Sequence, residues 1–169
     1  MVNFQNVGNI AEAPVTDFWK RIYSVTGLDL NKIWTVESYV DNKKLKGYFN
    51  SGCMAFNPSK GILRTWKNDY KKLLSDSANY AFLNSNRDFS IFCHQAVLSA
   101  VVMAKAGKDK VNLIPPSYGY PLQLQDFEEF INKKHSISDL VIVICGDYKN
   151  LKKIEITEPY KNWIDTHAK

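Results

Sequence analysis

Residues 88–106 constrain the fold of this chain more than any other segment, because they form a helix-length run that is apolar on nearly every side. A helix that is apolar all round is usually buried in the core of a protein. Gly107 follows the run, and glycine commonly ends helices. We therefore predict a helix over residues 88–106 that lies at the centre of the core.

The rest of the chain alternates between helical and strand patterns. Apolar residues at three- and four-residue spacing predict helices over residues 14–26, 62–74 and 127–131, and a terminal helix opened by Glu158 and Pro159. Short alternating or fully apolar runs predict a hairpin over residues 34–50 and strands over 53–56, 111–114, 140–145 and 151–156. Residues 75–87 fit either a short helix or a loop. This order indicates an α/β (mixed α+β) fold, in which helices flank a mixed sheet.

Length and composition favour one folded domain. With 169 residues and 45% apolar residues, we expect a single domain over residues 14–169 behind an N-terminal extension over 1–13. Three cysteines lie in apolar runs without Cys-x-x-Cys spacing, which favours reduced thiols over a disulfide frame or a zinc site: Cys53, Cys93 and Cys145. Together with the lack of a signal-like start or a membrane-length apolar run, this predicts a cytoplasmic protein.

The formal charge of +5 gives a weak preference for anionic partners. The lysines are mostly scattered singly or in pairs, as on solvated surfaces. We therefore expect neither a nucleic-acid stripe nor a membrane contact.

Polar residues at a glycine-marked corner form the first candidate site. Residues 47–58 read as a short buried strand entered through Asn50, Ser51 and Gly52. Glycine allows close approach of a ligand, and the two polar side chains can bond hydroxyls or phosphate oxygens. The alternative interpretation is an ordinary strand preceded by a turn.

Two further groups of polar residues adjoin apolar segments. His94 and Gln95 open the apolar part of the long helix, and buried polar side chains need a partner, either structural or a ligand. Tyr118 and Tyr120 lie in a proline-rich loop, where their rings could stack on a sugar or base and their hydroxyls could bond its edge. These tyrosines could equally cap the core.

The ordered set of Tyr48-Phe49-Asn50-Ser51-Gly52, Asn57-Pro58, a Trp66 helix, His94-Gln95 and a Tyr-Pro loop resembles the second half of nucleotide-sugar glycosyltransferases of the GT-A type. The resemblance implies that Gln95 faces the transferred sugar, while His94 stands where an acidic residue is common. We accordingly assign Gln95 and His94 as catalytic candidates. The candidate substrate-binding residues are Asn50, Ser51, Gly52, Tyr118 and Tyr120.

The resemblance covers only the acceptor-side half of such a domain. The family's Asp-x-Asp pair, which holds a divalent cation such as Mn²⁺ or Mg²⁺, does not occur in this sequence. We therefore expect no cofactor and no metal ligand in this chain, and a domain that is incomplete and inactive alone. Its partners would be a nucleotide sugar or glycan acceptor, with a second chain or a second copy in place of the nucleotide-binding half. The alternative is a non-catalytic interaction module that pairs with that half.

Overall fold

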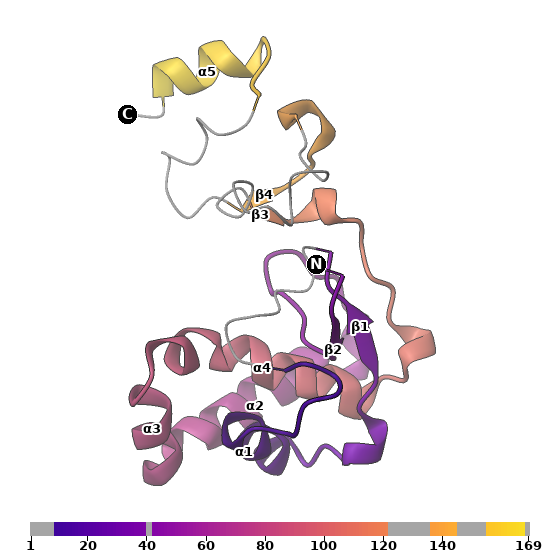
Figure 1. Ribbon diagram of the computed structural model, residues 1–169, viewed down its shortest axis with the longest axis vertical. Coiled ribbons are helices and arrows are strands. Elements are labelled where there is room, and N and C mark those ends of the chain that lie inside the picture. The colour runs from indigo at the N-terminus through magenta and orange to yellow at the C-terminus, as the bar shows by residue number, and fades with distance from the viewer. Residues whose placement is uncertain (1–8, 40–41, 122–135, 145–154, 168–169) are drawn as a thin grey trace. The chain divides into compact units, whose positions relative to one another are not determined.

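The computed structural model describes residues 9–39, 42–121, 136–144 and 155–167 (Figure 1). The chain divides into two compact units, Val2–Leu113 and Ile114–Lys169, and each is considered by itself below. Both helices and strands occur among the described residues, in agreement with the predicted mixed α and β composition. The assignment of residues 14–169 to one domain stays a prediction.

The long helix α4 (Arg87–Lys105) forms the centre of the first unit, as predicted. Every residue from Ala96 to Met103 is buried, so the helix is enclosed on all sides over this stretch. Three other helices pack against it and are seen around it in Figure 1: α1 (Asp17–Thr26), α2 (Ile62–Ser75) and α3 (Ser77–Asn84). The predicted helices over 14–26 and 62–74 are confirmed, and residues 75–87 contain the short helix that was one of two alternatives.

Local sequence signals explain where α1 begins and ends. Thr16 precedes the first turn in an extended conformation, and Gly27 follows the last turn with a left-handed φ of 65°. Glycine adopts that conformation without the strain a side chain would bring. The helix buries one face against the core, formed by Phe18, Trp19, Ile22 and Tyr23.

A two-stranded antiparallel hairpin completes this unit, as predicted. Strand β1 (Thr35–Glu37) pairs with β2 (Lys44–Lys46), and the opposed side chains of Val36 and Leu45 are both buried. Residues 9–13, expected to be an extension, lie along β2: Ile10 forms a bridge with Leu45. Three single-turn 3₁₀ helices link the larger elements: Leu30–Lys32, Pro58–Lys60 and Lys108–Lys110.

The strand expected over residues 47–58, with its buried part at 53–56, does not form. The Gly47 amide donates to the Trp34 carbonyl at 2.9 Å, but beyond it the described segment has no strand pairing. The Phe49 amide donates instead to the Ser99 hydroxyl on α4, at 2.8 Å. Because a helix side chain takes the place of a neighbouring strand, the backbone here is anchored without a sheet. Cys53, expected inside the sheet, is only half-buried.

The second unit contains short elements. Strand β3 (Tyr120–Pro121) pairs in parallel with β4 (Val143–Ile144), next to the 3₁₀ turns Pro116–Tyr118 and Ile137–Asp139. Helix α5 (Tyr160–His167) is the predicted terminal helix.

Two strand predictions near this unit are wrong, at least in part. Residues 111–114 pair with no described strand, and Leu113 is exposed. The prolines that follow cannot donate to a neighbouring strand, which limits pairing at this end. The predicted strand over 140–145 is confirmed only at Val143–Ile144, and Val141 before it is exposed. Residues 155 and 156 are not in a strand. The other expectations here lie outside the described residues: the helix over 127–131, the turn over 146–150 and most of the edge strand over 151–156.

Candidate functional site

The Tyr48-Phe49 segment is joined to α4 at two places. The Tyr48 hydroxyl donates a long hydrogen bond to Gln95 Oε1 at 3.4 Å. The neighbouring Phe49 amide donates to Ser99 Oγ, which in turn donates to the Gln95 carbonyl oxygen at 2.8 Å. Residues that are almost fifty positions apart in the sequence therefore form one connected group.

Packing of the surrounding side chains fixes this group. Tyr48 is fully buried and meets the Trp19 ring edge-on, with 5.7 Å between ring centroids. The Phe49 ring lies 5.2 Å from that of Trp34. At Gly47, an added Cβ would come within 2.7 Å of Sδ of the buried Met103, so any side chain here would force Met103 to shift. These contacts fix the path of the backbone from Gly47 to Phe49, directly before Asn50.

Burial favours the neutral forms of two titratable groups near Gln95, Tyr48 and Cys93. Burial raises the pKa of Tyr48 well above its ordinary value, and the nearby Cys93 thiol adds to the effect. Burial likewise raises the pKa of Cys93, whose Sγ lies 3.9 Å from the Tyr70 hydroxyl. A thiol that stays protonated is a poor nucleophile. Tyr48 and Cys93 therefore act here as neutral hydrogen-bonding groups and not as activated nucleophiles.

The predicted residues Asn50, Ser51 and Gly52 directly follow the anchored pair. The Asn50 carbonyl oxygen Oδ1 accepts a hydrogen bond from the Gly52 amide at 2.7 Å, which closes a local turn. Asn50 and Ser51 are half-buried, and Gly52 is exposed. The Asn50 oxygen is used within this turn, and Asn50 lies two residues after Tyr48, whose hydroxyl contacts Gln95 on α4.

The other predicted residues have different surroundings. His94 is half-buried, and its carbonyl oxygen accepts a hydrogen bond from Trp66 Nε1 at 2.9 Å, which connects α2 to α4. Tyr118 and Tyr120 belong to the second unit and are described apart from the first. Tyr118 is 39% exposed, whereas Tyr120 is fully buried. The Tyr120 ring could therefore contact a ligand only if the side chains around it moved.

Sequence reasoning missed two residues that organise this site. Ser99 is the one hydroxyl in the fully buried stretch of α4, and it anchors Phe49. A lone serine inside an apolar run is the signal that could have identified it, since a buried hydroxyl requires a partner. Tyr48 was part of the motif, but its contact with Gln95 depends on packing across the core.

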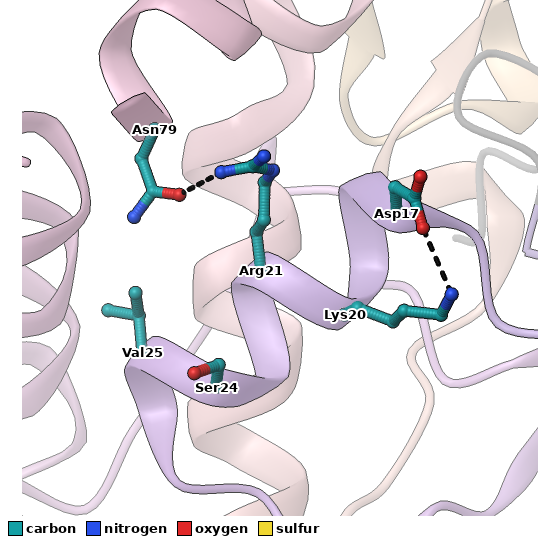
Figure 2. Close-up of a pocket in the computed structure, with 6 residues that line it drawn as sticks. All are labelled: Asp17, Lys20, Arg21, Ser24, Val25 and Asn79. Atoms are coloured by element: carbon teal, nitrogen blue, oxygen red, sulfur yellow. Dashed lines mark hydrogen bonds and ion pairs between the residues drawn. The ribbon is translucent and has the colours of Figure 1, made fainter. Parts of the chain in front are cut away.

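A separate hollow lies between α1 and α3 (Figure 2). It has a volume of about 370 Å³ and is lined by Asp17, Lys20, Arg21, Ser24, Val25 and Asn79. None of the predicted site residues borders it. Its polar side chains come from two helices, so no single sequence segment indicated it.

The described ranges hold neither a candidate metal cluster nor a membrane-spanning helix. No group of three or more His, Cys, Asp or Glu side chains there could hold a metal ion. Within the same ranges, the helices fall short of the length and apolar character that crossing a bilayer requires. Comparison of the chain with protein-family models, curated proteins and solved structures gave no match.

Proposed function

We propose that this chain is a glycosyltransferase-like domain of GT-A type that binds a nucleotide sugar or glycan through Asn50, Ser51, Gly52 and Gln95. The observation that carries the proposal is the contact between Tyr48 and Gln95. It joins two of the motifs on which the family resemblance depends, although they lie far apart in the sequence.

The chemistry of these side chains suits a hydroxylated ligand. An amide and a hydroxyl each offer donors and acceptors, as sugar hydroxyls do. In the proposal, the Gln95 NH₂ and the Asn50 NH₂ donate to sugar oxygens, while the Ser51 hydroxyl donates or accepts. The exposed Gly52 leaves room for the ring to approach.

Catalysis would need more than these groups. Sugar transfer from a nucleotide diphosphate develops negative charge on the leaving diphosphate, and a cation or fixed donors must stabilise it. In complete family members that role falls to a divalent cation, and this sequence has no Asp-x-Asp pair for it. We therefore propose binding without transfer by this chain alone.

Titration calorimetry with a panel of nucleotide diphosphate sugars and neutral oligosaccharides tests the proposal. We expect saturable binding of at least one ligand, weakened about two- to tenfold by Gln95→Ala, because one hydrogen bond contributes about 0.5 to 1.5 kcal/mol. Asn68→Ala is the matched control, since it removes an exposed amide from α2. Equal affinities for the two variants, or no binding across the panel, would refute the proposal.

A second function, an interaction module, is favoured by a different observation. Beyond Gly47, the described segment up to Asn57 has no strand partner. Residues 54–56 lie in no helix, strand or turn, and their backbone groups could pair with a strand of another chain. That strand would come from a separate nucleotide-binding half or from a second copy.

Light scattering on the purified chain separates the two functions. An interaction module should form a dimer or, when mixed with a candidate nucleotide-binding protein, a one-to-one complex. A monomer that binds sugars but no protein would leave the first proposal standing and exclude the second.

A further inference from the structure

The hollow between α1 and α3 carries an inference that is independent of the proposed sugar site, with which it shares no residue. It is lined mainly by polar and charged side chains of the two helices (Figure 2). Its volume, about 370 Å³, lies at the lower end of the range for small-molecule sites, which is roughly 300 to 1,000 Å³. The space is therefore sufficient for a small ligand.

The charge of the hollow is positive. Lys20 forms an ion pair with Asp17, with 2.9 Å between Nζ and Oδ1, so these two charges offset each other. Arg21 has a neutral partner instead: its guanidinium NH1 donates to Asn79 Oδ1 at 2.8 Å. The charge of Arg21 is thus not matched by a carboxylate at this contact.

Two contacts hold Arg21 in place before any ligand arrives. Besides the bond to Asn79, the guanidinium lies over the Phe82 ring, 4.4 Å from its centroid. A guanidinium has five N–H donors in a fixed plane, and the bond to Asn79 uses one of them. The other donors are held in a defined orientation, which lowers the entropy lost when an anion binds.

Two neutral groups add to this donor set. The Asn79 amide uses its oxygen for Arg21, and Figure 2 shows its nitrogen turned away from Arg21 and toward Val25 on α1. The Ser24 hydroxyl lies on the same stretch of α1 and is exposed. The hollow is therefore lined by the Arg21 guanidinium and the Ser24 hydroxyl from α1 and by the Asn79 amide from α3.

We propose that this hollow binds the phosphate group of a small molecule. Arginine recognises phosphate through paired hydrogen bonds, and the tetrahedral group has further oxygens for donors that approach from other directions. A planar carboxylate has only two oxygens and would leave some of these donors unused. Val25, at the edge of the hollow, would contact the apolar part of the ligand.

NMR titration of the full chain with inorganic phosphate tests this proposal. Chloride should hold the ionic strength constant during the titration, because salt screens exposed charges. We expect saturable shifts of the backbone amides of Arg21, Ser24 and Asn79. Asn79→Asp keeps the shape of the side chain and an acceptor for Arg21 but adds a negative charge to the hollow. It should weaken phosphate binding at least about tenfold, whereas Ser24→Ala should weaken it about two- to fivefold.

Asn68→Asp is the control, since it makes the same charge change at an exposed position of α2 outside the hollow. Its effect on phosphate affinity should stay within about twofold, as expected for a screened surface charge. Equal weakening by Asn79→Asp and Asn68→Asp, or shifts that never saturate, would overturn the proposal. Acetate binding as tight as that of phosphate would overturn the assignment of the group as phosphate.

Discussion

Replacing Ser99 by alanine should release the Tyr48-Phe49 segment from α4. Ser99 is fully buried, and its hydroxyl accepts from the Phe49 amide at 2.8 Å. Without the hydroxyl, the Phe49 N–H stays buried with no acceptor, and an unsatisfied buried donor costs about 1 to 3 kcal/mol. The hydroxyl's other bond, to the Gln95 carbonyl, is a local one within the helix, so its loss should add little.

Two measurements check this prediction. Urea unfolding should give a free energy of unfolding about 1 to 3 kcal/mol lower for Ser99→Ala than for the native chain. Amide hydrogen exchange should show the Phe49 N–H losing protection, because local opening exposes it to water. The second readout identifies the bond directly, even if the two units unfold separately.

Ser90→Ala is the matched control on the same helix. Ser90 is exposed, and its hydroxyl donates only to the Arg87 carbonyl within α4. Its replacement should change the free energy of unfolding by no more than about 0.5 kcal/mol. The reasoning would be refuted if Ser99→Ala and Ser90→Ala had the same free energy of unfolding and the Phe49 N–H kept its protection from exchange in Ser99→Ala.

Three further predictions concern the packing of the first unit. Gly47→Ala should lower the free energy of unfolding by about 1 to 3 kcal/mol in urea titrations, because its Cβ would press on the buried Met103. Gly107→Ala is the control and should change that free energy little, because its nearest obstacle is the exposed side chain of Asp109. Phe89→Ala removes a ring stacked between Phe18 and Phe82, at centroid distances of 4.8 and 5.3 Å. It should lower the free energy of unfolding by about 3 kcal/mol, measured by urea unfolding followed by tryptophan fluorescence. Burial raises the pKa of Tyr23 to about 12, against about 10 when unfolded, so stability should fall as the pH rises from 10 to 12. In Tyr23→Phe that fall should be smaller, and an identical pH profile would contradict the assignment.

The elements that sequence patterns predicted correctly are those fixed by local signals. Helix α1 has its starting residue, apolar face and final glycine within a dozen positions. Helix α4 is apolar all round, and that property alone requires burial. The hairpin follows from alternation of apolar and polar residues on either side of a turn.

Elements that depend on distant partners were harder to predict. A strand forms only where another strand is present to bond it, and residues 47–56 have the composition of a strand without such a neighbour among the described residues. The contact between Phe49 and Ser99 crosses fifty positions of sequence. The hollow near Arg21 likewise depends on how α1 and α3 pack. The contact of Arg21 with Phe82 joins them directly, and Phe89 of α4 stacks on both Phe18 of α1 and Phe82 of α3.

Sequence motifs named the residues of the candidate site, but they did not predict how these residues are arranged in space. Gln95 and the Asn50 corner were identified from motifs, but the link between them through Tyr48 depends on the packing of a buried ring. Tyr120 was predicted either to face a ligand or to cap the core, and its full burial is the result expected from the second interpretation. Sequence spacing gives no information on which side of its strand is covered.

The most direct test of the central claim, that Asn50, Ser51, Gly52 and Gln95 form one sugar-binding surface, is a map of NMR shift changes at saturation with the tightest-binding nucleotide sugar. The account predicts the largest changes at the backbone amides of residues 50–52 and at the Gln95 side-chain NH₂. Largest changes around Arg21 and Asn79 instead, with residues 50–52 and Gln95 unmoved, would contradict it.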